Sequence, residues 1–189
     1  MRNKIILSAV LSLFAVSCGA AALWRTGSYT RIVSVEVDYS ADTRELLDPY
    51  GQVDTLIETN IPEDNIQTPY FRSIDQDVSL PADRQTLRSM ILLHVNWTGG
   101  VVYDDYAIYE MDLLGMRPAT VLETLFFLKH SGYVLESANV VALGSYWTNG
   151  SGGRMVMVAS KRSGDKILRL HHAGEGFPSD WVFLAVSLR

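Results

Sequence analysis

The last fifty residues alternate between short apolar runs and short segments rich in glycine and small polar residues. The intervening segments, centred on residues 149–153, 163–165 and 174–178, have the composition of hairpin turns. The runs themselves have the length of strands and cover residues 140–147, 154–160, 166–171 and 181–188. Strand-length runs joined by such turns predict a C-terminal antiparallel β-meander.

Strands are also predicted upstream of this region. The odd-numbered residues of 33–39 are apolar and alternate with polar ones, which is typical of a strand with one buried face. Residues 86–97 contain the apolar run of another strand, and residues 71–80 are a weaker candidate. Before them, Asp42 or Thr43 can cap a short helix.

Two longer helices are predicted in the middle of the chain. Residues 104–114 carry two acidic residues at their start and an apolar stripe, and Gly115 supplies the usual stop. Thr120 and Glu123 have the spacing of a capping box, so a second helix begins there. Together these elements predict a single α+β domain over residues 32–189, in which about two helices pack on one face of an antiparallel sheet.

The N-terminus has the layout of a bacterial export signal, with a basic start and an apolar stretch. The only cysteine of the chain, Cys18, follows this stretch. Its context resembles the lipobox of bacterial lipoproteins, although Ala15 stands where leucine is usual. In that family the cysteine thiol takes a diacylglyceryl group and cleavage makes the cysteine the new N-terminus. The resemblance implies a signal peptide over 1–17, a lipidated tether over 18–31 and an exported, membrane-anchored body on the periplasmic or cell-surface side.

Two other fates of this segment stay open. Residues 5–24 hold no charge and are long enough to cross a bilayer uncleaved, with Trp24 and Arg25 as interfacial anchors. The alanines of residues 20–22 fit an ordinary cleavage site, which would release the body. All three routes export the body, because the basic start keeps the N-terminus inside.

Composition excludes some classes of function. The chain has 16 basic and 21 acidic residues, a formal charge of −5, which argues against a nucleic-acid partner. A single cysteine excludes an intrachain disulfide and a thiolate metal cluster. Five basic residues nevertheless fall in one predicted hairpin, as a candidate anion-binding patch or as protection of a sheet edge. They are Arg154, Lys161, Arg162, Lys166 and Arg169.

Candidate catalytic groups are few. His171, His172 and Glu175 form the most ligand-like cluster, but neighbouring strand residues point to opposite faces, so we expect no metal and no cofactor. The glycine-rich residues 149–153 lack the helix that follows a phosphate loop and are better explained as a hairpin loop. Ser145 lacks the second glycine of a nucleophile elbow.

Several short motifs of the body occur in a characteristic order. This set resembles a group of proteins of uncultured candidate-phylum bacteria, with the approximate pattern RPAT…EL…ALGS.W…FLAV, often preceded by V.VDY. The group has no established activity, so the resemblance implies one domain over 32–189 and assigns no site residues. The motifs here lie at residues 35–39, 115–120, 123–125, 141–147 and 183–186.

The leading expectation is a membrane-anchored envelope lipoprotein that displays a small binding or scaffolding domain. Its partners would be the membrane, through the lipid, and an envelope protein or an anionic cell-wall polymer. One alternative is an envelope-polymer hydrolase that uses the region of His171, His172 and Glu175. The other is an uncleaved single-pass subunit of an envelope complex.

Overall fold

The computed structural model describes residues 27–29, 32–55, 57, 85–95, 99–130 and 138–187. The expected signal peptide, Cys18 and the strand candidate at 71–80 lie outside these ranges. The helices are α1 (Thr43–Leu47), α3 (Asp104–Leu113), α4 (Val121–His130) and the short 3-10 helix η1 (Ala173–Glu175). The strands are β1 (Gly27–Tyr29), β2 (Val33–Asp38), β3 (Gln52–Val53), β4 (Gln85–Val95), β5 (Val101–Val102), β6 (Met116–Pro118), β7 (Val140–Thr148), β8 (Arg154–Arg162), β9 (Asp165–His172), β10 (Phe177–Pro178) and β11 (Val182–Ser187).

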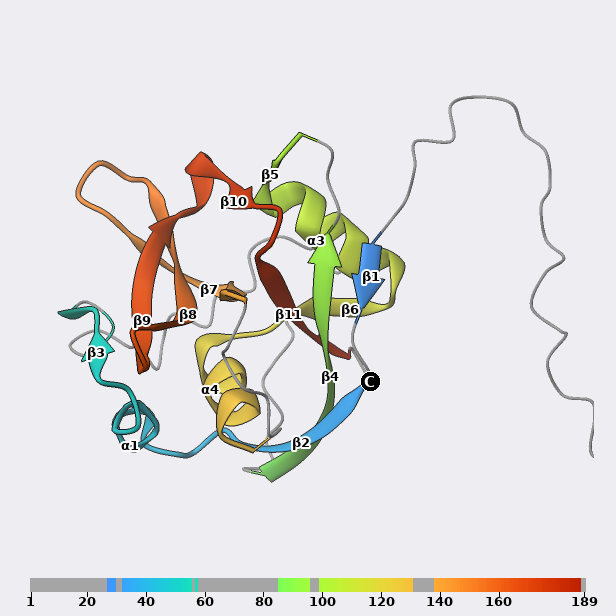
Figure 1. Ribbon diagram of the computed structural model, residues 1–189. Coiled ribbons are helices and arrows are strands. Elements are labelled where there is room, and N and C mark those ends of the chain that lie inside the picture. Colours follow the sequence, from blue (N-terminus) through green and yellow to red (C-terminus); the bar gives the residue numbers. More distant parts are fainter. Residues whose placement is uncertain are drawn as a thin grey trace, which may run out of the picture.

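Most of these strands belong to one curved sheet. Its order is β1-β4-β11-β7-β8-β9-β3, with β2 paired to the first part of β4 and β6 to the last part of β11. Within the described part of the chain, the pairs β11–β7 and β3–β9 are parallel and the others are antiparallel. In Figure 1 the strands from β9 round to β2 curve about α4. The predicted α+β class with a mainly antiparallel sheet is confirmed.

The C-terminal meander is present in its first three strands, and the fourth departs from it. β7, β8 and β9 pair in sequence, but β11 lies between β4 and β7 and runs parallel to β7. All five residues from Val182 to Val186 are buried. A strand that is apolar on both faces is suited to the centre of a sheet, whereas the turn composition before it carries no information on its partner.

The two longer helices lie on opposite faces of the sheet, which corrects the prediction of a single covered face. Alternate residues of the central strands enter two separate apolar cores. One core takes in residues of α1 and α4, and the other takes in Ala107, Ile108 and Met111 of α3. Between α3 and α4, strand β6 pairs with β11 in the plane of the sheet, so the chain passes there from one face to the other.

The local stop and start signals act as the sequence predicts. The Asp42 side chain caps α1 by accepting the backbone N–H of Arg44 at 2.9 Å. Gly115 follows α3 with a φ of +68°, a left-handed conformation that costs glycine little. At the β8–β9 turn both Ser163 and Gly164 have positive φ, as a two-residue type I′ hairpin requires.

Candidate functional site

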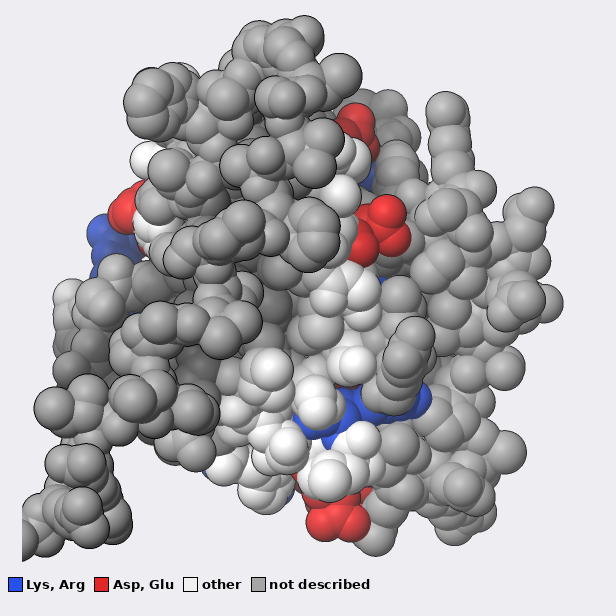
Figure 2. Space-filling view, turned by 90° about the vertical axis from the view of Figure 1, so that its right-hand side faces the viewer, with Lys and Arg blue, Asp and Glu red and all other residues white. Residues whose placement is uncertain are grey.

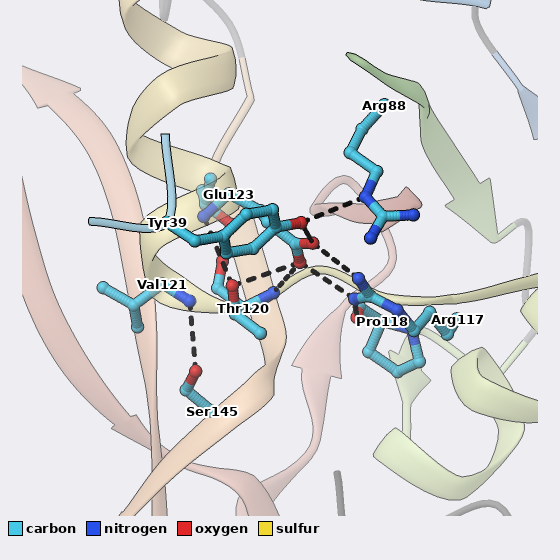
Figure 3. A network of polar contacts seen from close by, with 9 residues as sticks. Tyr39, Arg88, Arg117, Pro118, Thr120, Val121, Glu123 and Ser145 are labelled. Atoms are coloured by element: carbon cyan, nitrogen blue, oxygen red, sulfur yellow. Dashed lines mark hydrogen bonds and ion pairs between the residues drawn. The ribbon is translucent and has the colours of Figure 1, made fainter. Parts of the chain in front are cut away.

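The densest group of buried polar contacts in the described residues surrounds Glu123 (Figure 3). Glu123 lies in the first turn of α4 and is 0% exposed, and Arg117 of β6 is 3% exposed. The two terminal nitrogens of Arg117 donate to the two carboxylate oxygens at 2.8 and 2.5 Å. This bidentate ion pair joins β6 to α4 inside the core, where planar guanidinium and carboxylate groups match each other's geometry.

Three other donors complete the environment of the carboxylate. The Tyr39 hydroxyl donates to Oε1 of Glu123 at 2.6 Å, and Nε of Arg88 in turn donates to the Tyr39 oxygen at 3.1 Å. The backbone N–H and the hydroxyl of Thr120 donate to Oε2 at 2.9 and 3.1 Å. The Glu123 N–H donates back to the Thr120 hydroxyl at 3.3 Å, which completes the predicted capping box. The carboxylate therefore accepts five hydrogen bonds.

These contacts set the protonation states of the group. Burial alone would raise the pKa of Glu123, but the donors from Arg117, Thr120 and Tyr39 outweigh it and lower that pKa. Burial opposes the charge of Arg117 as well, yet its bonds to Glu123 raise the Arg117 pKa. Burial and the Glu123 charge raise the pKa of Tyr39 to about 12. A general acid or base needs a pKa near the working pH, so this network is suited to holding the fold rather than to proton transfer.

A second part of the same junction joins β7 to the start of α4. The Gly144 N–H donates to the Ala119 carbonyl at 2.8 Å, and a Cβ at Gly144 would lie only 2.6 Å from that carbonyl oxygen. The Ser145 hydroxyl, which is buried, accepts the Val121 N–H at 3.1 Å. Ser145 therefore caps one of the free N–H groups of the first turn of α4. The Ala119 N–H donates to the Leu184 carbonyl at 3.0 Å, which adds β11 to the junction.

Most of the short sequence motifs thus meet in one place. The segments around residues 39, 117–123, 144–145 and 184 are far apart in the chain and are joined by the contacts just described. We name the group formed by Tyr39, Arg88, Arg117, Thr120, Glu123, Gly144 and Ser145 the buried junction. The contacts within this group give Arg117, Gly144 and Ser145 structural roles.

The buried junction also contains residues that no local sequence pattern indicates. They are Arg117, Tyr39 and Arg88. A local pattern cannot indicate them as partners of the Glu123 network, because each lies on another element or far away in the chain. One local signal was available. Arg117 stands between the apolar residues Met116 and Pro118, and a charged side chain that is buried with such neighbours requires a partner.

His171 belongs to an aromatic cluster on one face of the sheet. Its Nε2 atom lies 2.7 Å from the Gly176 carbonyl oxygen. Its ring packs against Phe177 and Trp181, with centroid distances of 5.2 and 5.0 Å. The imidazole is therefore held by packing and by one hydrogen bond.

His172 and Glu175 do not complete a site with it. His172 follows on the strand and faces the opposite side, where its ring lies close to Gly153 and Gly174. Its Nδ1 atom is buried and makes no hydrogen bond in the structure. Glu175 is exposed. Among the described residues, no three histidine, cysteine or acidic side chains are arranged to hold a metal ion.

The five basic residues of the β8–β9 hairpin divide into two groups. Arg154 forms an ion pair with Asp104 at 2.6 Å, and the Arg169 guanidinium lies 4.9 Å from the centroid of the Trp181 ring. Burial lowers the pKa of Arg169. The other three are exposed and flank the turn, and we call them the basic tip: Lys161, Arg162 and Lys166.

On the side of the molecule shown in Figure 2, the acidic and basic side chains of the described residues lie in small groups. In the ranges that the structure describes, no helix is long and apolar enough to span a bilayer. Comparison of the chain with protein-family models, curated proteins and solved structures gives no match.

Proposed function

We propose that the protein is a bacterial envelope lipoprotein, acylated at Cys18, that displays a small binding or scaffolding domain on the outer side of a membrane. The observation that carries this proposal is the position of the only cysteine, which lies at the end of an export signal in a lipobox-like context. Several buried methylene groups of an acyl chain, at about 0.8 kcal/mol each, would hold the protein at the membrane.

The position of the first described strand supports this arrangement. β1 begins at Gly27, so eight residues separate it from Cys18. A chain of that length spans roughly 30 Å when extended. The tether would therefore keep the domain within a few nanometres of the bilayer surface.

The chemistry of the interior supports a binding or scaffolding role. The charged groups of the buried junction join β6 to α4 and to Tyr39, which directly follows β2. Ser145 serves the first turn of α4, and His171 packs in an aromatic cluster. Ser145 and His171, two of the groups that the sequence offered for catalysis, therefore have structural roles.

Labelling of cells with an alkyne fatty acid tests the acylation. We expect label on the wild-type protein and none on Cys18→Ser. A matched control carries Cys18→Ser together with Ser151→Cys, which moves the thiol to an exposed loop and should also stay unlabelled. An unlabelled wild type, or label that persists in either variant, contradicts the proposal.

The intact mass of protein from the membrane fraction separates the three fates of the N-terminus. A mass of residues 18–189 plus acyl chains supports the lipoprotein. A mass of all 189 residues would instead indicate an uncleaved single-pass anchor, and an unacylated mass beginning after residues 20–22 would indicate a secreted protein.

A further inference from the structure

Helix α3 and the residues beside it carry a concentration of exposed apolar side chains. Of seven large hydrophobic side chains that are exposed among the described residues, five belong to residues 101–114. Tyr109 is 51% exposed and Leu113 is 46% exposed. A concentration of exposed apolar and aromatic residues in one segment is typical of a surface that binds another protein.

The outer face of α3 combines aromatic and acidic groups. Tyr109 and Leu113 lie four residues apart, at helical spacing, on the exposed side of the helix, whereas Tyr106 is half-buried and packs against the core. Asp105 and Asp112 lie four residues before and three residues after Tyr109, so both are its neighbours on the helix surface. We call Asp105, Tyr109, Asp112 and Leu113, which are all exposed, the α3 face. The ten residues of α3 include no lysine or arginine, so nothing on the helix itself neutralises these acids.

This composition favours a cationic protein partner. A lysine or arginine stem can lie on the Tyr109 ring while its charged end reaches a neighbouring carboxylate. An anionic lipid surface would be repelled by the same carboxylates. A second α3 face would be repelled too, because like charges would be brought together.

The domain carries such a cationic surface itself, on another side. The basic tip contains Lys161, Arg162 and Lys166 around a type I′ turn, and Asp165 lies opposite Arg162, so three positive charges and one negative charge meet there. The tip leads into the beginning of β9, and that part of β9 pairs with β3. In Figure 1, β3 lies at the left, whereas α3 lies at the upper right. The two surfaces are therefore opposite in charge and too far apart to meet within one chain.

We propose that copies of this chain associate head to tail, with the basic tip of one copy on the α3 face of the next. Such a contact is heterologous and therefore builds rings or open rows. The contact is small and largely charged, so it is weak in dilute solution. Attachment of the copies to one membrane would raise their effective concentration toward the millimolar range, and only this last step rests on the proposed function.

Cysteine cross-linking of the full chain in its own membrane tests the contact. Leu114→Cys lies beside the α3 face and Ser163→Cys lies in the exposed turn of the tip, and neither changes a charge that the contact uses. With a bismaleimide, the double variant should give a ladder of dimers, trimers and longer multiples, whereas each single variant should not. The control pair Leu114→Cys with Ser151→Cys, at a different hairpin loop, should give no ladder either.

Charge reversal tests the chemistry within that double variant. Lys161→Glu with Lys166→Glu should reduce the ladder about tenfold, since two exposed ion pairs are turned into repulsions. Adding Asp105→Lys with Asp112→Lys should restore it. Salt at about 1 M should abolish the ladder of the unreversed protein.

The proposal is overturned if no ladder forms or if the control pair gives the same ladder. It is also overturned if the reversal at the tip does not weaken the ladder, or if the reversal on α3 does not restore it. Capture of a different protein or of lipid at Leu114→Cys, in place of the ladder, overturns it as well. A failure of the lipoprotein proposal is distinguishable. In that case the fatty-acid label would be absent, while the double variant that also carries Cys18→Ser, purified in detergent at about 1 mM, would still give the ladder.

Discussion

Replacing Glu123 with glutamine tests the energetic role of the buried junction. The substitution keeps the shape of the side chain and removes its charge, and it presents an amide NH₂ group where one carboxylate oxygen accepted hydrogen bonds. Arg117, which is 3% exposed, then keeps its charge without a bidentate partner. Leaving one member of a buried ion pair alone costs about 3–5 kcal/mol. That is a large part of the roughly 5–15 kcal/mol by which domains are stable.

The pH dependence of the unfolding free energy gives a second, independent test of the same role. The folded-state pKa of Glu123 lies below its ordinary value of 4.5. Its charged form therefore stabilises the fold fully above pH 4.5, and this contribution is lost as the pH falls through the lowered pKa. Glu123→Gln lacks the contribution at every pH. The difference in unfolding free energy between the two proteins should therefore shrink as the pH falls below 4.5.

Urea unfolding followed by far-ultraviolet circular dichroism, at a series of pH values, measures both effects. The matched control is the double variant Arg117→Met with Glu123→Leu, which removes both charges and should cost less than Glu123→Gln alone. Our account is refuted if Glu123→Gln lowers the unfolding free energy by less than about 1 kcal/mol, within the range of an ordinary hydrogen bond. It is also refuted if the apolar pair proves the more harmful change.

Three further predictions concern stability. Gly144→Ala should lower the unfolding free energy by about 1–3 kcal/mol, because its Cβ would meet backbone atoms at 2.6 Å, whereas Gly150→Ala, with open space around it, should be nearly neutral in the same urea titration. Burial raises the pKa of Tyr39 and Tyr50 to about 12, so their neutral forms stabilise the fold below pH 10 and this contribution is lost as the pH rises through about 12. Thermal unfolding of each phenylalanine variant should lose less stability over that interval than the wild type; an equal loss would show that the other groups of the protein govern alkaline unfolding. Ser145→Ala should cost about 1 kcal/mol, since it leaves the N–H of the first residue of α4 without its acceptor; a neutral result in chemical denaturation would mean that water replaces the hydroxyl.

The elements that the sequence predicted correctly depend on residues close together in the chain. Asp42 caps α1, Gly115 follows α3, and Thr120 with Glu123 opens α4. Each of these signals involves groups within four residues of one another. Their energies are those of local hydrogen bonds and backbone conformation, which neighbouring residue types largely determine.

The arrangement of the elements could not be predicted in the same way. Whether β11 pairs with β9 or enters between β4 and β7 depends on which distant strands can cover both of its apolar faces. The side of the sheet that α3 takes depends on β6, a strand of three residues that no periodicity could reveal. In the candidate site, the sequence indicated the local half of the contacts of Glu123, while Arg117 and Tyr39 come from the tertiary fold.

The position of β11 has a consequence for how the protein is made. Without residues 182–187 the sheet falls into two parts, one containing β4 with β1 and β2, the other β7, β8, β9 and β3. A ribosome synthesises both parts before the strand that joins them. The nascent chain therefore exposes two apolar strand edges until Ser187 has emerged, and such edges invite pairing with other chains. Completion of the fold must wait for its central strand, so a chaperone that shields those edges during synthesis or export would protect the protein when it is most vulnerable.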